Sequence, residues 1–458
     1  MISSESMTPS ERRATMALAS IMSTRLLGLF MIFPIFALYA QDLPGVTPIL
    51  VGLAIGIYGL TQAILQIPFG MLSDRFGRKP IIYIGLLIFA LGSVIAALST
   101  SMTGIIIGRA LQGGGAIAST VLAMTADLTR EEHRTKAMAM IGMSIGASFM
   151  LALIAGPVLN RWIGVSGIFW LTAGFALAGI AILRLAVPQP LISHPQRKLA
   201  VPAQFKRVLQ DTQLLRLDFG ILLLHLLMTS LFVVLPLALV EAKLEAEHHW
   251  LIYASVLLAS VIVMVPLIIL AEKYRIIKIV FVGAIGLLGL SQLGLSYLHQ
   301  SLTGIVLMLF LFFTAVNLLE ANLPSLISKM APAESKGTAM GVYSSSQFFG
   351  AFLGGISGGW LHQHYGIGSV FAFCAALTVV WFLLAATMQK PRHLSSHLLK
   401  IGQIDKQQAD QLTQCLMQVP GVAEVVVILE EGVAYLKVDR KVLDVEALNG
   451  CSATTNCA

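Results

Sequence analysis

The chain has 458 residues, of which 57 % are hydrophobic and only 12 % are charged, and its mean hydropathy is +0.83. Soluble proteins carry about 25 % charged residues, so this composition excludes a soluble globular protein and predicts a polytopic membrane protein. The formal net charge of +7 does not indicate a nucleic-acid partner, because the basic residues are concentrated in alternate loops.

Twelve apolar segments of about 20 residues have the length of transmembrane helices. They lack the short alternation of apolar and polar residues that barrel strands show. No secretory cleavage pattern follows the first segment, which we expect to be an uncleaved helix. The predicted spans are residues 16–40, 51–70, 80–98, 103–125, 138–159, 166–186, 217–240, 251–271, 277–297, 303–327, 339–361 and 368–387.

The loops after spans 2, 4, 6, 8 and 10 hold sixteen basic residues, whereas the opposite loops hold only Arg161 and Lys243. This asymmetry is the positive-inside signal, and it predicts an inner-membrane protein with both termini in the cytoplasm. The sixteen are Arg75, Arg78, Lys79, Arg130, Arg134, Lys136, Arg197, Lys198, Lys206, Arg207, Arg216, Lys273, Arg275, Lys278, Lys329 and Lys336.

A long interior break, residues 187–216, divides the spans into six and six. A repeat crosses it, because Met102-Thr103-Gly104-Ile105 opens span 4 and Leu302-Thr303-Gly304-Ile305 opens span 10. Two parallel six-helix halves are typical of transporters whose site lies between the halves. We expect an N-terminal half at 1–187, a cytoplasmic linker at 188–216, a C-terminal half at 217–390 and a cytoplasmic domain with its tail at 391–458.

The C-terminal segment alternates like a small α/β domain. Strands are expected at 399–401, 423–429 and 433–438, and helices at 405–417 and 442–448. This order suggests a ferredoxin-like domain. Disulfides are not expected for cysteines in the cytoplasm, and the Cys451–Cys457 pair has no nearby histidine to complete a metal site. The sequence therefore predicts neither metal nor cofactor.

The turn between spans 2 and 3 carries a dense group of glycines and charges: Gly70, Asp74, Arg75, Gly77, Arg78 and Lys79. It resembles, at every defined position, the G-x-x-x-D-R-x-G-R-[KR] signature of the major facilitator superfamily. Arg109-Ala110-Leu111-Gln112-Gly113 is similar to that family's span-4 motif. The resemblance covers nearly the whole chain and implies a transporter in which two six-helix halves rock against each other.

In the resembled family this turn acts as a conformational latch. We expect Arg78 to pair with Asp127, and Asp74 to face the positive peptide dipoles at the start of span 11, near Thr338. Both contacts would stabilise the state closed to the cytoplasm. A plain topology anchor is the alternative, although it leaves Asp74 and Asp127 unexplained.

A glycine pattern that the family's antiporters carry in span 5 is only partly kept, at Gly156-Pro157. Span 11 follows the spacing better, with Gly341, Gly350, Gly354, Gly358 and Gly359, and Gly355 in place of the proline. Small residues that permit tight helix packing explain both spans equally well.

Ionisable residues inside spans are candidates for function, because a charge in lipid costs about 2.5–3.5 kcal/mol or more. Four such residues are Arg25, Arg109, His225 and Glu320, in spans that the resemblance places around the central cavity. Arg25, His225 and Glu320 lie at similar depths and are expected to meet in one layer. Glu320 is the candidate proton carrier and His225 its partner. A static ion pair, a packing histidine and helix-to-helix bonding by Arg109 remain alternatives.

Polar side chains are expected to line a mostly apolar cavity, which suits amphipathic molecules: Tyr58, Gln62, Gln112, Asn317, Tyr343 and Gln347. Asp42 and residues 241–249 are expected to be solvated in periplasmic loops. The tail shares a Pro-Gly-Val turn with heavy-metal-associated domains, but residues 401–405 lack their C-x-x-C, which disfavours metal delivery.

These features together predict a monomeric, proton-coupled secondary transporter that exports hydrophobic or amphipathic small molecules. There is no Walker A loop, nucleophile elbow or H-E-x-x-H, so no enzyme is expected. The expected partners are a small-molecule substrate, protons and the lipid bilayer. Proton-driven uptake of a metabolite and a membrane sensor that signals through its tail domain are the alternatives.

Overall fold

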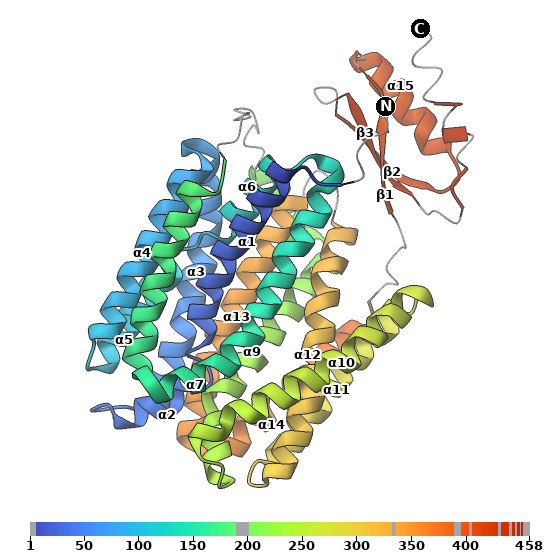
Figure 1. Ribbon diagram of the computed structural model, residues 1–458. Helices are drawn as coiled ribbons and strands as arrows, with labels where there is room; N and C mark the ends of the chain where they lie inside the picture. Colours follow the sequence, from blue (N-terminus) through green and yellow to red (C-terminus); the bar gives the residue numbers. More distant parts are fainter. Residues whose placement is uncertain are drawn as a thin grey trace.

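The computed structural model describes residues 6–188, 201–331, 336–388, 395–402, 405–428, 432–438, 442–444, 447–448 and 450–451. Long helices run side by side in one bundle, and a small mixed domain follows the last of them (Figure 1). The first part of the bundle comprises α1 (Pro9–Phe30), α2 (Phe36–Tyr39), the 3-10 turn η1 (Ala40–Asp42), α3 (Pro48–Phe76), α4 (Arg78–Leu98), α5 (Met102–Gly114), α6 (Ala118–Leu128) and α7 (Glu131–Leu185).

The second part begins with the short helix α8 (Val201–Gln210), whose neighbours in space are α9 and α13. Its other elements are α9 (Thr212–Glu241), the 3-10 turn η2 (Ala246–His248), α10 (His249–Lys273), α11 (Ile277–Leu298), α12 (Leu302–Met330), α13 (Lys336–Tyr365) and α14 (Ile367–Ala386). Each predicted span overlaps at least one of these helices.

Among the described residues, nine helical stretches are long and apolar enough to cross a membrane. The stretch 136–185 contains two predicted spans, because Gly164 takes a left-handed φ of 66° and interrupts α7. α1 and α13 are helical where spans were predicted but are not among the nine. The total of twelve crossings therefore stays a prediction.

Two predicted spans are broken in the structure. The span predicted at 16–40 ends at Phe30, and the chain turns before α2, where Pro34 has no N–H to continue a helix. The span predicted at 103–125 is divided into α5 and α6 at a run of glycines. At this break, a Cβ on Gly115 would lie 2.4 Å from the carbonyl oxygen of Gly85, so only glycine permits the close approach of α4.

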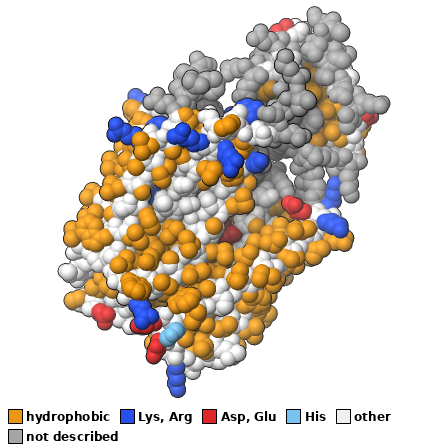
Figure 2. Space-filling view, viewed as in Figure 1, with side chains coloured by type: hydrophobic (Ala, Val, Ile, Leu, Met, Phe, Trp, Pro, Cys, Tyr) orange, Lys and Arg blue, Asp and Glu red, His pale blue; other side chains and the backbone are white. Residues whose placement is uncertain are grey.

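The face of the bundle seen in Figure 2 is largely apolar, and on it Lys and Arg side chains gather at the end where α1 begins. We call this end, which also holds the α3–α4 turn, the basic end, and the end that holds η1 and η2 the opposite end. Large side chains such as Leu258 and Ile262 on α10 are more than 60 % exposed. A surface of this kind is stable against lipid rather than water.

The tail domain contains β1 (Ser395–Lys400), α15 (Lys406–Gln418), β2 (Val422–Ile428) and β3 (Val433–Val438). The strands and α15 follow one another along the chain as predicted, strand, helix, strand, strand, although β1 starts earlier than expected. In the sheet the three strands are antiparallel in the order β1-β3-β2. Leu412 and Leu416 of α15 pack with Ala434 and Leu436 of β3 in a separate small core. Part of the helix predicted at 442–448 lies outside the described residues.

Cys415 and Cys451 form a disulfide in the structure, across the same small core. The expectation that the tail cysteines are unpaired is therefore wrong for this pair. The sequence separation of 36 residues hid the pairing, because only the fold brings α15 next to the end of the chain. Cys457, the other member of the metal pair considered from the sequence, lies outside the described residues.

Candidate functional site: polar clusters between two helix bundles

The charged turn between α3 and α4 is a compact cluster within the first part of the bundle. Gly77 ends α3 with a φ of 91°, a conformation that favours glycine, and α4 starts at the next residue. Arg78 Nε donates to Asp127 Oδ2 at 3.0 Å, its Nη1 donates to Ser73 Oγ at 2.7 Å, and it forms an ion pair with Asp74. One guanidinium thus ties together α3, α4 and α6.

The other members of the turn have local roles in this structure. Gly70 lies against Ser119 of α6, and the Arg75 guanidinium lies over the Phe76 ring at 5.3 Å. The partner that the structure gives Asp74 is Arg78, on the same side of the molecule. The expected contact of Asp74 with the start of α13 near Thr338 stays a prediction, as does the latch role of the whole turn.

At the opposite end, α3 and α13 pack backbone to backbone. A Cβ on Gly52 would lie 2.0 Å from the Gly355 carbonyl oxygen, and one on Gly359 would lie 2.4 Å from the Pro48 carbonyl oxygen. A Cβ on Gly59 would likewise meet the Phe348 carbonyl oxygen at 2.4 Å. This approach is possible only because small residues line both helices.

Toward the basic end the same two helices separate. The antiparallel register that pairs Gly52 with Gly355 and Gly59 with Phe348 would place Gly341 opposite Gln66. No described atom lies within 4 Å of the position that a Cβ on Gly341 would take. The two parts of the bundle are therefore in contact at the opposite end and apart along this pair of helices at the basic end.

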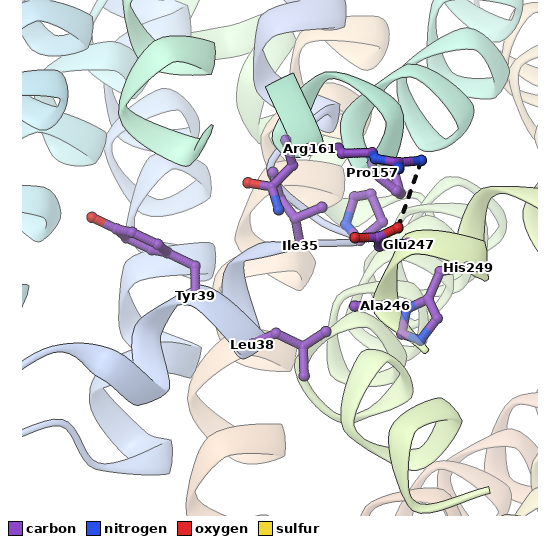
Figure 3. A pocket seen from close by; sticks show the side chains of 10 residues that line it. Ile35, Leu38, Tyr39, Pro157, Arg161, Ala246, Glu247 and His249 are labelled. Atoms are coloured by element: carbon purple, nitrogen blue, oxygen red, sulfur yellow. Dashed lines mark ion pairs between the residues drawn. The ribbon is translucent and has the colours of Figure 1, made fainter. Parts of the chain in front are cut away.

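A small pocket lies between the two parts at the opposite end (Figure 3). Arg161 at the end of the first stretch of α7 and Glu247 of η2 form an ion pair across it, with an Nη1–Oε2 distance of 3.6 Å. Phe33 and Phe232 also meet between the two parts, with ring centroids 5.6 Å apart. The expectation that residues 241–249 are solvated agrees with Glu247, whose side chain is 55 % exposed, but is wrong for His249, which is 1 % exposed.

Two buried arginines surround one tyrosine ring in the first part. The guanidinium carbons of Arg25 and Arg109 lie 5.7 and 5.3 Å from the centre of the Tyr58 ring. Arg25 donates to Gln62 Oε1 at 2.5 Å, and Arg109 donates to Gln112 Oε1 at 3.0 Å. Arg109 Nε also donates to the Ala54 carbonyl oxygen at 3.2 Å. Amides, carbonyls and an aromatic face thus hold both cations without a carboxylate partner among the described residues.

The candidate proton carrier lies in the second part. Oε1 of Glu320 on α12 lies 3.5 Å from Nε2 of His225 on α9. Nε2 of Gln347 on α13 lies 2.8 Å from the same His225 nitrogen. The His225 side chain is 9 % exposed and that of Glu320 is 36 % exposed. Three helices therefore converge on one histidine, whose second neighbour is a carboxylate that solvent reaches.

The predicted polar residues form two groups rather than one layer. Arg25 joins Arg109, Tyr58, Gln62 and Gln112 in the first part, whereas His225, Glu320 and Gln347 join in the second part. The contacts described for Arg25 therefore do not support its expected meeting with His225 and Glu320. The ring of Tyr58 lies 6.3 Å from that of Phe348, which links the two groups. Asn317 donates to Ser260 Oγ of α10 at 2.9 Å.

Sequence reasoning missed Asp218, one residue inside the predicted seventh span. It is only 4 % exposed, and neither carboxyl oxygen has a hydrogen-bond partner in the part of the chain that the structure describes. Sequence reasoning assigned it to the preceding loop, because an acid beside the start of an apolar segment normally belongs to the loop. Its burial by neighbouring helices could not be read from the chain.

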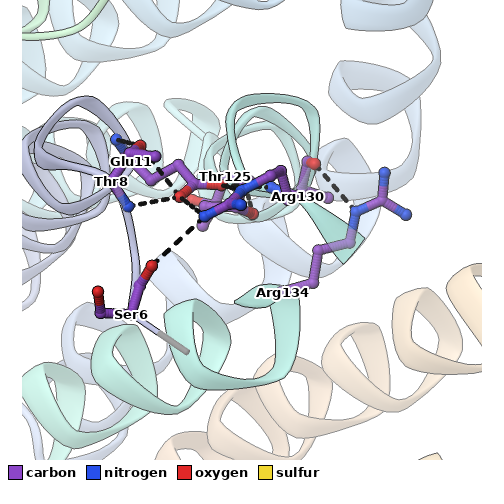
Figure 4. Close-up of polar contacts among 8 residues, drawn as sticks. Ser6, Thr8, Glu11, Thr125, Arg130 and Arg134 are labelled. Atoms are coloured by element: carbon purple, nitrogen blue, oxygen red, sulfur yellow. Dashed lines mark hydrogen bonds and ion pairs between the residues drawn. The ribbon is translucent and has the colours of Figure 1, made fainter. Parts of the chain in front are cut away.

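A second missed contact ties α1 to the start of α7 (Figure 4). Glu11 accepts hydrogen bonds from Arg130 Nε at 3.0 Å and Nη2 at 3.1 Å, and from the Arg130 backbone N–H at 2.8 Å. Hydrogen bonds from Arg130 lower the pKa of Glu11 to about 2. Thr8-Pro9-Ser10-Glu11 has the spacing of a capping box, and this sequence signal could have located the start of α1.

Comparison with families of known proteins covers nearly the whole chain. The Major Facilitator Superfamily matches residues 18–246 and 217–404, and the YajR YAM domain matches residues 404–448. The inner membrane transport protein YajR of Escherichia coli K12 is 47 % identical over 438 residues, which are 95 % of this chain and 96 % of YajR. Multidrug resistance protein MdtH of Proteus mirabilis is 26 % identical over 370 residues, 79 % of this chain and 88 % of MdtH.

Solved structures show the same fold at lower identity. The human organic anion transporter MFSD10 superposes with a TM-score of 0.63 at 20 % identity, covering 82 % of this chain and 100 % of MFSD10. A bacterial homologue of the lysosomal transporter Spinster superposes with a TM-score of 0.68 at 14 % identity, covering 83 % of this chain and 98 % of that one.

Proposed function

Because this chain belongs to the Major Facilitator Superfamily, a family of transporters rather than enzymes, we propose that it exports hydrophobic or amphipathic molecules in exchange for protons. Membership establishes a multi-pass inner-membrane protein that works by alternating access. The proton coupling, the direction of transport and the class of substrate are the parts that we propose.

The contact between Glu320 and His225 is the observation that carries the proposal. The Nε2 atoms of His225 and Gln347 are 2.8 Å apart, so the Gln347 amide nitrogen donates and the His225 ring nitrogen accepts. A neutral His225 accepts from the Gln347 amide, and a protonated His225 instead donates, to Glu320 or to a rotated Gln347 amide. Each neighbour can therefore stabilise a different protonation state of the same histidine.

Glu320 is the second titratable group in this contact. A carboxylate inside the bundle is costly when charged and less costly when protonated or beside a cation. Its side chain is 36 % exposed in a structure whose two parts are in contact at the opposite end. Rocking of the two parts would change the solvent exposure of Glu320, and the change in exposure would change whether its carboxyl group is protonated.

The basic end is, in this proposal, the cytoplasmic end. The loops at this end contain most of the basic residues outside the spans, as the positive-inside rule requires of cytoplasmic loops. The structure then corresponds to a state open toward the cytoplasm. The Arg161–Glu247 pair and the α3–α13 glycine contact would hold the periplasmic side closed, and they would break when the transporter opens outward.

The substrate class follows from the side chains between the two parts. Phe33 and Phe232 are buried where the two parts meet and would be uncovered when the parts separate, whereas Phe348 lies beside single polar groups such as Tyr58 and Gln347. This mixture suits molecules with a large apolar body and few polar atoms. The relative MdtH carries the name of a multidrug resistance protein, which supports export.

The test uses purified protein in proteoliposomes with an acidic lumen and ethidium as the amphipathic probe. We expect the protein to accumulate ethidium in the lumen, and we expect Glu320→Gln to reduce accumulation at least tenfold while ethidium exchange without a gradient persists. Glu272→Gln is the control, because Glu272 is exposed at the end of α10. Full gradient-driven accumulation in Glu320→Gln would overturn the assignment of Glu320.

A further inference from the structure

Asp218 is an acid that the proton coupling described above does not use. It lies in the second turn of α9, is 4 % exposed, and has two buried carboxyl oxygens that find no hydrogen-bond partner among the described residues. An unpaired carboxylate in such a place costs far more than a neutral carboxylic acid, because only the charged form loses its full hydration. The position therefore favours a carboxyl group that holds a proton in this conformation.

The packing of α9 on α13 places a tyrosine at the level of Asp218. A Cβ on Gly350, Gly354 or Gly358 would meet Leu222, Leu226 or Ser230, respectively, which is a constant offset of 128 residues between two parallel helices. The same offset sets Tyr343 level with Leu215, within one turn of Asp218.

The hydroxyl of Tyr343 is also buried, and no described residue hydrogen-bonds to it. Tyr343 lies one turn from Gln347, which contacts His225, the neighbour of Glu320. Two carboxyl groups and one phenol thus lie along these helices, and among the described residues the buried oxygens of Asp218 and Tyr343 have no hydrogen-bond partner. Buried polar groups normally have such partners, so each exception asks for an explanation.

The helices also connect these groups to the histidine. Asp218 and His225 are seven residues apart on α9, which is two turns or about 10 Å, and so they lie on one face. Tyr343 and Gln347 are one turn apart on α13, and Gln347 contacts His225. Asp218 and Tyr343 therefore lie nearer the basic end than the Glu320–His225 contact does, on the same two helices.

We propose that Asp218 is a second protonation site, placed between Glu320 and the basic end and connected to Glu320 by Tyr343. The proposal rests on the proton coupling proposed above. In the transfer, the Tyr343 hydroxyl accepts the proton of the Glu320 carboxylic acid and gives its own proton to the Asp218 carboxylate. Glu320 becomes a carboxylate, Asp218 becomes an acid, and Tyr343 is unchanged. Asp218 then releases the proton to water at the basic end.

Other charged groups near this site come from several elements. On α9, Arg216 donates to the Thr387 carbonyl oxygen at 2.9 Å, and on α8, Lys206 and Arg207 are exposed. The last turn of α3 carries Asp74 and Arg75, and α14 has no charged residue in its sequence. Glu247 and His248 of η2 lie at the far end of α9. The side chains of Lys329 and Lys336 lie outside the described part of the chain.

The experiment measures protonated carboxyl groups directly, by infrared difference spectroscopy of the full-length protein in lipid between acidic and alkaline pH. We expect two carboxylic-acid bands in the wild type. Asp218→Asn should remove one, Glu320→Gln the other, and the double variant both. Asp42→Asn, which changes an exposed acid in η1, should retain both. An Asp218→Asn spectrum that superimposes on that of Asp42→Asn would overturn the proposal.

Two further variants separate this site from a packing role. Asp218→Glu keeps a carboxyl group and should show a displaced band, whereas a structural role predicts no titrating band. Tyr343→Phe should keep both bands but slow gradient-driven ethidium transport about tenfold; unchanged transport would remove Tyr343 from the path. If Glu320→Gln transports normally while the Asp218 band is present, the proposed role of Glu320 fails and the Asp218 site stands.

Discussion

Buried charges are stabilised differently in the two parts of the bundle. Arg109 donates to a carbonyl and an amide, and both it and Arg25 lie against Tyr58. These contacts pair Arg109, whereas Arg25 keeps two buried guanidinium nitrogens without a hydrogen-bond partner among the described residues. Among the same residues, Glu320 and Asp218 have few or no partners, as expected of groups that gain and lose protons. At the scale of single residues, the first part holds fixed charge and the second part holds titratable charge.

The role of the Tyr58 ring can be separated from that of its hydroxyl. The hydroxyl has no hydrogen-bond partner within the described ranges of the chain, so Tyr58→Phe should leave thermal stability nearly unchanged. Tyr58→Leu removes the face that both guanidinium groups contact, and should destabilise the protein by about 2 kcal/mol. Thermal unfolding in detergent compares the two. Equal melting temperatures for both variants would show that the ring contacts contribute nothing.

The Glu11–Arg130 pair should make stability depend on pH. The pKa of Glu11 is lowered to about 2 in the folded protein, from an ordinary value near 4.5. Its contribution is therefore complete above about pH 4.5 and is lost as the pH falls toward 2. Glu11→Gln should cost about 2 kcal/mol at pH 7, and this difference from the wild type should shrink below pH 4.5.

Melting temperatures of both proteins across that pH range give the measurement. Glu272→Gln, at an exposed position, serves as the control. A difference that stays constant between pH 7 and pH 3 would mean that the charge of Glu11 is not what stabilises the contact.

At the scale of elements, α13 is the helix on which both packing surfaces meet. Gly350, Gly354 and Gly358 contact α9, whereas Gly355 and Gly359 contact α3. One face thus belongs to the permanent packing of the second part and the other to a contact between the parts. The glycine spacing that the sequence shares with antiporters is explained in this structure by close helix packing.

A side chain at Gly355 should prevent closure at the opposite end. In Gly355→Val the new Cβ would lie 2.3 Å from the Gly52 carbonyl oxygen, so the two helices must separate. Spin labels at positions 42 and 365 should report longer distances than in the unsubstituted protein. Gly341→Val places the same side chain where no described atom lies within 4 Å, and should leave the distances unchanged. Identical distributions in the two variants would show that the Gly52–Gly355 contact does not control closure.

At the scale of the whole molecule, the tail domain is a separate folding unit with its own small core and disulfide. The sites proposed here lie entirely in the helical bundle. Deleting residues 391–458 should therefore leave gradient-driven ethidium transport within about twofold of the full chain. Loss of all transport from a correctly inserted, monodisperse bundle would contradict this and favour a protein that acts through its tail.

Much of this architecture was determined locally by the sequence. Apolar runs of spanning length, the charged turn at Gly77 and the starts of β2 and β3 are set by neighbouring residues, and so the helices, most of their limits and the three-stranded pattern could be predicted. The candidates Glu320, His225 and Gln347 were also recognisable, because ionisable and polar groups are rare in apolar segments.

Only the tertiary structure decided which of these groups meet. Arg25 joined Arg109 rather than His225 because α1, α3 and α5 pack within the first part. Asp218 lost its solvent and Cys415 found Cys451 through packing between segments distant in sequence. The periodicity of a helix specifies which residues share a face, but the neighbour that this face contacts depends on the packing of the whole bundle.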